Sequence, residues 1–119
     1  CDEKYEIAAS AYGAPTLDVG CCTDVISGID KTRVFETGIA HMRPDVIITD
    51  ELFGADIESV RRAATCGISV VATVHAKNTD DVMLKPEFRA AAESGLFMLY
   101  AVISPAPRRA VTVFEEASI

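Results

Sequence analysis

The stretch Pro44-Asp45-Val46-Ile47-Ile48-Thr49-Asp50-Glu51 decides how this chain can fold. Residues 45–49 contain three consecutive β-branched apolar side chains, and two adjacent carboxylates follow them. A short run that is apolar on both faces predicts a strand buried in a parallel sheet, with helices above and below. Because ligands bind at the carboxyl ends of such strands, Asp50 and Glu51 are expected where a ligand can reach them. A divalent cation, or a water held between the pair and a phosphate, would relieve the repulsion between the two carboxylates.

The composition limits the classes of protein that the chain can represent. At 119 residues, of which 50% are apolar, it is expected to form a single domain over residues 1–119. Its formal net charge of −7 is not that of a nucleic-acid binder, so no nucleic-acid partner is expected. No apolar run approaches the roughly 20 residues that span a bilayer, which predicts no direct membrane insertion.

The four cysteines form no metal-binding or disulfide pattern. Cys21 and Cys22 are adjacent, Cys1 and Cys66 stand apart, and no Cys-x-x-Cys occurs. Unpaired thiols of this kind fit a reducing, cytoplasmic compartment. The chain also starts with Cys1 rather than Met and with no strand before its first acidic residues, so it is expected to be a fragment that lacks an amino-terminal part.

Periodicity predicts an α/β domain with a mainly parallel sheet and an antiparallel edge. Apolar residues at helical spacing predict helices over residues 31–42, 56–66, 80–84 and 87–94. Apolar runs predict strands over residues 45–49, 68–74, 96–103 and 110–114, the last two joined as a hairpin through residues 104–109. Residues 11–30 are rich in Gly, Asp, Ser and Thr and are expected to form a long loop, which in a compact domain is usually functional.

A histidine follows the second predicted strand. His75 lies at the carboxyl end of residues 68–74, one helix after the Asp50 strand. Successive strands are often neighbours, so Asp50, Glu51 and His75 are expected to face one crevice. A neutral imidazole there could hydrogen-bond a phosphate or position a water. The alternative is a histidine that only closes the loop.

Four segments now occur in one order: Asp2-Glu3-Lys4-Tyr5-Glu6-Ile7-Ala8, Thr23-Asp24-Val25, residues 44–51, and Ala72-Thr73-Val74-His75-Ala76. An apolar strand followed by Asp-Glu is the Walker B pattern of P-loop ATPases. Together the segments resemble the carboxyl-terminal half of the stage III sporulation protein AA family. That family is a branch of the RecA-like ATPases, related to the secretion motors of type II and type IV systems.

The resemblance implies a RecA-like P-loop ATPase core and a role for each motif residue. Asp50 would hold Mg²⁺ through water, and Glu51 would orient the water that attacks ATP. His75 would sense the γ-phosphate, with Thr73 of the same segment at the nucleotide. Glu3 and Glu6, at the acidic-box position, would reach the same water network, and which of the two matters is left open.

The same resemblance implies cellular partners. The chain would belong to an ATP-hydrolysing motor in the cytoplasm of a spore-forming bacterium. The motor would be a homo-oligomer, a hexameric ring, docked on membrane-channel proteins between mother cell and forespore. Neither composition nor spacing points to this role.

The sequence departs from the family pattern in two ways. No Gly-x-x-x-x-Gly-Lys-Ser/Thr loop occurs, so the 119 residues alone are expected neither to bind ATP well nor to hydrolyse it. Cys22 also stands where the family usually has an arginine before Thr-Asp-Val. Arg33 or Arg43 could substitute for it, or the chain could be a catalytically inactive scaffold.

A second resemblance points to a signalling module. Residues 44–50 also resemble the phosphoacceptor strand of a response-regulator receiver domain, with Asp2 and Glu3 as its acidic pair and Thr73 as its switch hydroxyl. Receivers need a lysine at the end of the last parallel strand, and here Ser104 and Pro105 follow the run 99–103. The receiver is therefore the weaker of the two readings.

Overall fold

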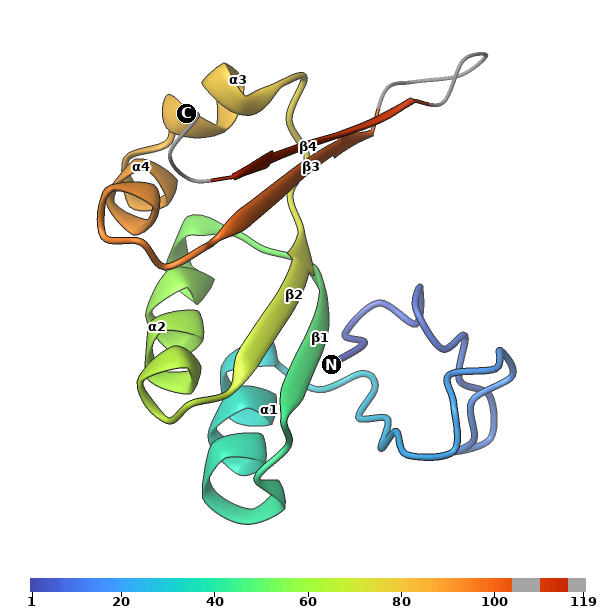
Figure 1. Ribbon diagram of the computed structural model, residues 1–119. Coiled ribbons are helices and arrows are strands. Elements are labelled where there is room, and N and C mark those ends of the chain that lie inside the picture. The colour runs from blue at the N-terminus through green and yellow to red at the C-terminus, as the bar shows by residue number, and fades with distance from the viewer. Residues whose placement is uncertain (104–109, 116–119) are drawn as a thin grey trace. The chain divides into compact units, whose positions relative to one another are not determined.

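The computed structural model describes residues 1–103 and 110–115. The chain groups into two compact units, Cys1–Thr73 and Val74–Ile119, which can be followed by colour in Figure 1. The single domain expected over residues 1–119 stays a prediction.

The first helix of the first unit begins directly after its N-cap residue, Asp30. Helix α1 (Lys31–Thr37) continues directly into a π-helical turn (Gly38–Met42). Asp30 caps the amino end, its side chain accepting the backbone N–H of Arg33. At the other end Arg43 takes a left-handed conformation with φ 48°, and Pro44 prevents the helix from continuing. The helix expected over residues 31–42 is therefore confirmed, with its last turn widened.

Strands β1 (Val46–Glu51) and β2 (Ser69–Thr73) form a parallel pair. Between them the chain passes through a 3₁₀ turn (Gly54–Asp56) and helix α2 (Ile57–Thr65). Gly67, with φ 79°, then turns the chain back toward β2, as a glycine past a helix end is expected to do. This β-α-β unit is the parallel connection that the sequence predicted.

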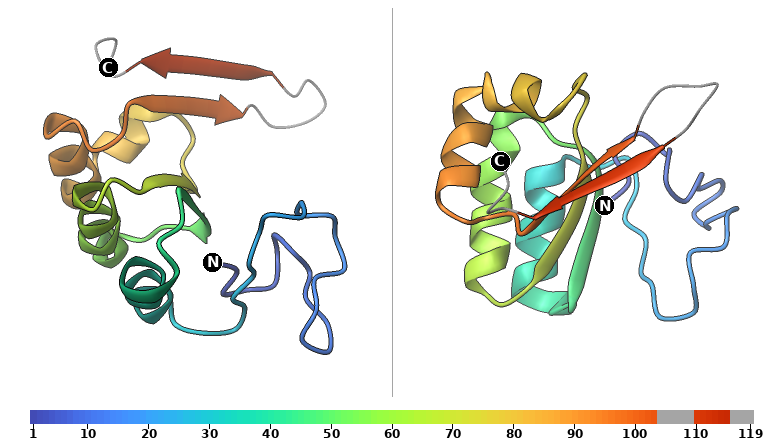
Figure 2. Two further views of the ribbon diagram at one scale, coloured as in Figure 1. Left: turned by 60° about the horizontal axis from the view of Figure 1, so that its bottom comes forward. Right: turned by 45° about the horizontal axis from the view of Figure 1, so that its top comes forward.

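Helices cover one face of this strand pair. Helices α1 and α2 lie on the same side of β1 and β2 in Figures 1 and 2. Along β1 the side chains of Ile47 and Thr49 are buried, whereas Val46 and Ile48 are 47% and 51% exposed. The sequence predicted burial on both faces, and within this unit that prediction is wrong for β1. A run of β-branched residues does not by itself reveal whether a second layer is packed against it.

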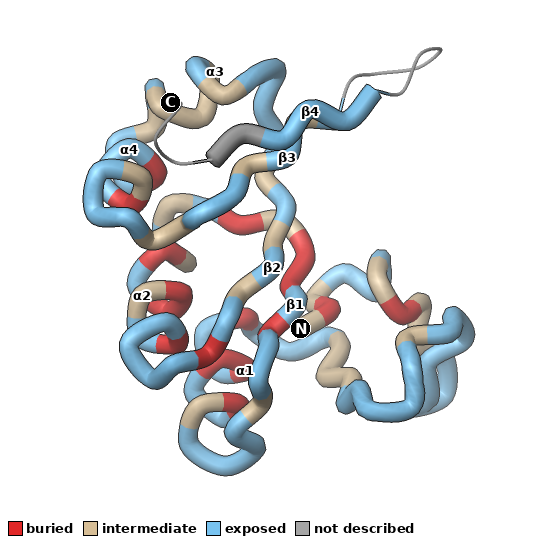
Figure 3. The backbone as a smooth tube through the Cα atoms, viewed as in Figure 1, coloured by how far each residue is buried: buried red, intermediate tan, exposed pale blue. Residues whose placement is uncertain are grey.

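The core of the first unit lies between the helices and that face (Figure 3). Its buried apolar side chains come from α1, β1, α2 and the segments next to them: Val34, Phe35, Ile47, Leu52, Ile57, Val60, Ala63 and Ile68. Burial of these side chains is the main favourable contribution to folding of the unit.

Residues 1–30 contain no helix or strand beyond isolated bridges, which confirms the predicted loop over residues 11–30. The segment is nevertheless ordered around one carboxylate. Asp2 is 1% exposed and accepts the backbone N–H groups of Glu6 (2.7 Å), Ile7 (3.0 Å) and Ala8 (2.9 Å). Three such bonds satisfy the buried charge and hold residues 2–8 in a tight turn.

The second unit carries two short helices and a hairpin. Helix α3 (Thr79–Met83) is capped by Asn78, whose side chain accepts the N–H of Asp81 at 2.9 Å, and helix α4 (Pro86–Glu93) opens with its proline. Strands β3 (Leu99–Ile103) and β4 (Val111–Glu115) pair antiparallel. These elements confirm the predicted ones, whereas the expected hairpin connection, residues 104–109, lies outside the described residues.

The four strands are grouped into sheets differently from the prediction. Among the described residues β1 and β2 form one two-stranded sheet, and β3 and β4 form another. The single, mainly parallel sheet with an antiparallel edge is therefore not what these residues form. Strand sequences specify pairing partners weakly, and a short hairpin can pair with itself as readily as extend a neighbouring sheet.

Candidate functional site

Asp50 and Glu51 are the last two residues of β1 rather than the first residues beyond it. The pairing with β2 shifts register between Ile48 and Glu51. At this irregularity the alternation of buried and exposed side chains breaks, so Thr49 and Asp50 are both buried. Asp50 is only 4% exposed, which means that its charge needs compensation from the protein itself.

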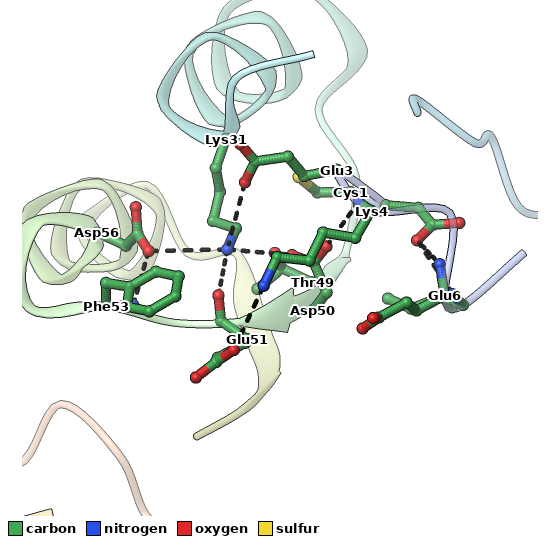
Figure 4. Close-up of polar contacts among 12 residues, drawn as sticks. Cys1, Glu3, Lys4, Glu6, Lys31, Thr49, Asp50, Glu51, Phe53 and Asp56 are labelled. Carbon is green, nitrogen blue, oxygen red and sulfur yellow. Dashed lines mark hydrogen bonds and ion pairs between the residues drawn. The ribbon is translucent and has the colours of Figure 1, made fainter. Parts of the chain in front are cut away.

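Lys31 provides that compensation. Its Nζ lies 3.0 Å from Oδ1 of Asp50 and donates a hydrogen bond to the carbonyl oxygen of Glu51. Carboxylate oxygens of Asp56 and Glu3 lie 3.7 and 3.8 Å from the same nitrogen (Figure 4). Lys31 itself is 3% exposed, so the ammonium group is surrounded by oxygen atoms and shielded from water. We call these five residues the Lys31 cluster.

The position of Lys31 follows from the helix that carries it. Lys31 is the first residue of α1, and it shares a face with Val34 and Phe35, three and four residues later. Those two side chains are buried, so the lysine also points into the unit. Lys31 belongs to none of the motifs that the sequence revealed. The available signal was a lysine in line with an apolar helical stripe, which requires a buried partner.

The amino-terminal residues complete the surroundings of Asp50. The backbone nitrogen of Cys1 donates to the carbonyl of Ile48 at 2.6 Å, so this segment runs along β1. The N–H of Lys4 donates to Oδ2 of Asp50 at 3.2 Å, and the hydroxyl of Thr49 lies 3.4 Å from Oδ1. Both oxygens of Asp50 therefore have donors from the chain.

Glu51 lies at the more open side of the cluster. Its side chain is 21% exposed, and its Oε2 lies 3.4 Å from Nζ of Lys4. The ring of Phe53 lies below both lysines, with its centroid 5.5 Å from Nζ of Lys4 and 5.9 Å from Nζ of Lys31. Both distances fit cation–π contacts.

These contacts change the acidity of Asp50. Burial, the largest single influence, would raise its pKa, because it disfavours the charged form. The hydrogen bond from Lys31, the N–H of Lys4, the charge of Lys31 and the hydroxyl of Thr49 act in the opposite direction. Together they hold the pKa of Asp50 below its ordinary value, so Asp50 stays an anion paired with Lys31.

The structure separates the residues of the predicted acidic box. Glu3 lies in the Lys31 cluster, with 40% of its side chain exposed. Glu6 is exposed and lies apart from the ammonium group of Lys31 in Figure 4, while its backbone N–H binds Asp2. Of the two glutamates left open by the sequence, Glu3 is the one that the structure brings to Lys31, the partner of Asp50.

Thr73 lies next to Glu51. The two residues are partners across the parallel pair, and the carbonyl of Thr73 accepts the N–H of Leu52 at 2.8 Å. Thr73 is exposed. The carboxyl ends of β1 and β2 therefore meet at one edge, as the sequence predicted.

His75 belongs to the second unit, just after its first residue. Its side chain is exposed, and its carbonyl accepts a hydrogen bond from Nζ of Lys85 at 3.1 Å. Lys77 and Asn78 follow, with the N–H of Lys77 donating to Asp81 at 3.0 Å. The expectation that His75 faces Asp50 and Glu51 stays a prediction.

One protein family matches nearly the whole chain. The model of the family described as sporulation stage III, protein AA matches residues 1–117, which include every residue discussed above. The chain belongs to the sporulation stage III protein AA family.

A relative supports this assignment. Stage III sporulation protein AA of Bacillus subtilis (strain 168) is 30% identical over 106 residues. The match covers 88% of this chain and 34% of that protein, so the chain spans about a third of the length of its relative. No solved structure matches the chain. Among the described residues, no helix is long and apolar enough to cross a membrane.

Membership in the sporulation stage III protein AA family weighs against the receiver reading, and so does the state of Asp2. Its carboxylate is buried and accepts three backbone N–H groups, so it is not presented to a cation as the acidic pair of a receiver would be. Cys22, where the resemblance implies an arginine, is exposed. Arg33 and Arg43 are exposed as well.

The Lys31 cluster as it stands does not fit Mg²⁺ held by Asp50 through water. Within the part of the chain that the structure describes, no three His, Cys, Asp or Glu side chains are arranged to hold a metal ion. The carboxylate of Asp50 is 3% exposed and already takes an ammonium and a backbone N–H. A water that bridges to a metal would need the space that Nζ of Lys31 occupies.

Proposed function

We propose that this chain forms part of an ATP-hydrolysing motor ATPase of the sporulation stage III AA type, with a RecA-like core. The observation that carries the proposal is the position of Glu51. It lies at the carboxyl end of a parallel strand, beside Thr73 of the neighbouring strand, in a chain that belongs to this family. Ligands of open α/β sheets bind at this edge.

Glu51 is the best-placed residue for the chemistry. Its carboxylate is partly exposed, so it can reach a water, and the ion pair with Lys4 restricts where it points. A carboxylate held in this way can orient a water and accept its proton. In this proposal Thr73 contributes a hydroxyl beside it, and Glu3 extends the acidic surface from the other side of Lys31.

The remaining parts of the proposal rest on the family likeness. The 119 residues contain no Gly-x-x-x-x-Gly-Lys-Ser/Thr loop, so the phosphates of ATP would be held by polypeptide outside these residues. His75 would sense the γ-phosphate. The motor would act in the cytoplasm as a hexameric ring, docked on channel proteins between mother cell and forespore.

The test uses the protein extended upstream of Cys1 so that a phosphate-binding loop is present. We expect this protein to hydrolyse ATP, and Glu51→Gln to slow turnover by about a hundredfold while ATP still binds, because a positioned general base is lost. Glu58→Gln is the matched control: Glu58 lies on α2, with 76% of its side chain exposed, and its replacement should leave turnover unchanged. A folded extended protein that does not hydrolyse ATP, or whose Glu51→Gln variant is fully active, would refute the proposal.

One observation favours a second function, that of an inactive scaffold which keeps the fold. That observation is the 3.0 Å contact by which Lys31 holds Asp50. The resemblance also implies an arginine where this chain has Cys22. A scaffold predicts that the extended protein binds ATP with no turnover and that Glu51→Gln changes nothing. The same pair of variants therefore distinguishes the two functions.

A further inference from the structure

We propose that Lys31 is the resident cation of Asp50 and that a divalent metal ion and Lys31 exclude one another there. The inference goes beyond the ATPase proposal, because it concerns which cation neutralises a buried carboxylate and requires no nucleotide.

Geometry is the first reason. A hydrated Mg²⁺ keeps its waters at about 2.1 Å, and a bridging water stands at hydrogen-bond distance from the carboxylate. Nζ of Lys31 lies 3.0 Å from Oδ1 of Asp50, which is where such a water would stand. The other oxygen, Oδ2, accepts the N–H of Lys4. Because the side chain of Asp50 is only 3% exposed, an ion that approaches Oδ1 must displace the ammonium group.

The oxygen atoms around Lys31 are the second reason. The ammonium group is within 4 Å of carboxylate oxygens of Asp50, Asp56 and Glu3, and it also binds the carbonyl of Glu51. Carboxylate and carbonyl oxygens are the atoms that Mg²⁺ and Ca²⁺ prefer. In this chain these oxygen atoms surround the ammonium group of Lys31, the first residue of α1.

Charge is the third reason. Without Lys31, the carboxylates of Asp50, Asp56 and Glu3 would lie close together at the end of β1. Lys4, which lies beside them, is already paired with Glu51. Carboxylates that share a site repel one another, and they are relieved by a proton or by a cation. Removal of the Lys31 charge should therefore create an affinity for divalent ions that the native chain lacks.

The experiment is a Mg²⁺ titration of the 119-residue chain without nucleotide, followed through the backbone amide NMR signals of residues 49–51 and the melting temperature. The variants are Lys31→Met, which removes the charge at similar length, Lys31→Arg, which keeps it, and Lys4→Met, which removes a lysine that is 46% exposed beside the same cluster. We expect Lys31→Met to bind Mg²⁺ about tenfold or more tightly than the native chain and to melt at a higher temperature when Mg²⁺ is added. Lys31→Arg and Lys4→Met should behave like the native chain. Equal Mg²⁺ affinity of the native chain and Lys31→Met would overturn the proposal.

If Lys31→Met does not fold, the proposal is tested on the native chain instead. Reductive methylation of Lys31 is measured with increasing Mg²⁺, together with the amide signal of Asp50. The proposal is supported if Mg²⁺ changes neither the methylation of Lys31 nor the amide signal of Asp50. It is also supported if the reactivity of Lys31 rises in step with a saturating shift of the Asp50 signal. A saturating shift at Asp50 while Lys31 stays protected would show that both cations are held at once, and the proposal would fall.

Discussion

Strands β1 and β2 run parallel, yet the residues at their carboxyl ends lie in different surroundings. At the end of β1, Asp50 is 4% exposed and bound by Lys31, a lysine 19 positions earlier in the chain that is itself 3% exposed. At the end of β2, Thr73 is exposed, and in the next unit His75 is exposed as well. A position at the end of a parallel strand therefore brings a polar side chain to the edge of the sheet. The packing around that side chain decides whether it is buried and ion-paired or exposed to water.

The contrast has an energetic meaning. A buried ion pair gains little over an apolar pair, but loss of one partner strands the other charge in a medium that solvates it poorly. An exposed side chain keeps its contact with water, so its removal changes stability little. Variants at Asp50 and Lys31 should therefore affect folding, and variants at His75 should affect function alone.

The largest expected effect is that of Lys31→Met, which leaves Asp50 buried without its counter-ion. We expect the free energy of unfolding at pH 7 to fall by about 3–5 kcal/mol, measured by urea denaturation. Lys4→Met, at a lysine 46% exposed, should cost less than about 1 kcal/mol. Comparable losses in the two variants would show that burial does not distinguish the two lysines.

Asp2→Ala extends the comparison to the loop that precedes α1. The variant removes the acceptor of three backbone N–H groups, and charged hydrogen bonds of this kind predict a loss of about 2–4 kcal/mol in the free energy of unfolding. Hydrogen exchange at residues 6–8 should accelerate in parallel. Asp24→Ala, at an exposed aspartate of the same loop, should change neither quantity. Slow exchange at residues 6–8 in Asp2→Ala would mean that other contacts hold the turn.

The loss of stability in acid tests whether the folded chain holds Asp50 as an anion paired with Lys31. Because the folded chain holds the pKa of Asp50 below its ordinary value, the unfolded chain binds its proton first as the pH falls. The contribution of Asp50 should be complete above about pH 5 and be lost as the pH falls from about 4 through the lowered folded pKa, by at most about 1.4 kcal/mol per pH unit. Urea denaturation of the native chain and of Asp50→Asn over this range measures it. If the two curves fall with the same slope, the Lys31–Asp50 pair does not contribute to acid stability.

The smallest expected effect on folding is that of His75→Ala. Because the side chain is exposed, the free energy of unfolding should change by less than about 0.5 kcal/mol. In the protein extended upstream of Cys1, turnover of ATP should fall while ATP affinity stays within a few-fold, as expected for a contact made mainly in the transition state. His41→Ala, at the other histidine of the chain, which is also exposed, is the matched control. A large drop in melting temperature with turnover intact would make His75 a structural residue.

Sequence alone placed the helices and strands, because local chemistry ends them. Asp30 and Asn78 cap helices, Pro44 and Gly67 terminate them, and Pro86 opens one, all within a few residues of the predicted positions. These signals depend on backbone sterics and on hydrogen bonds between close neighbours, so they can be read without the fold. The ordered motifs also indicated the family, and the match over residues 1–117 showed it.

Only the tertiary structure decided which residues meet at Asp50. Lys31 and the N–H of Lys4 reach it from 19 and 46 positions away, and Glu3 joins the cluster through Lys31. No local rule selects a distant lysine as the partner of a buried carboxylate. The same holds for the covered and exposed faces of β1 and for the separate pairing of β3 with β4. Burial depends on what packs against a residue, and packing is a property of the whole unit rather than of the strand itself.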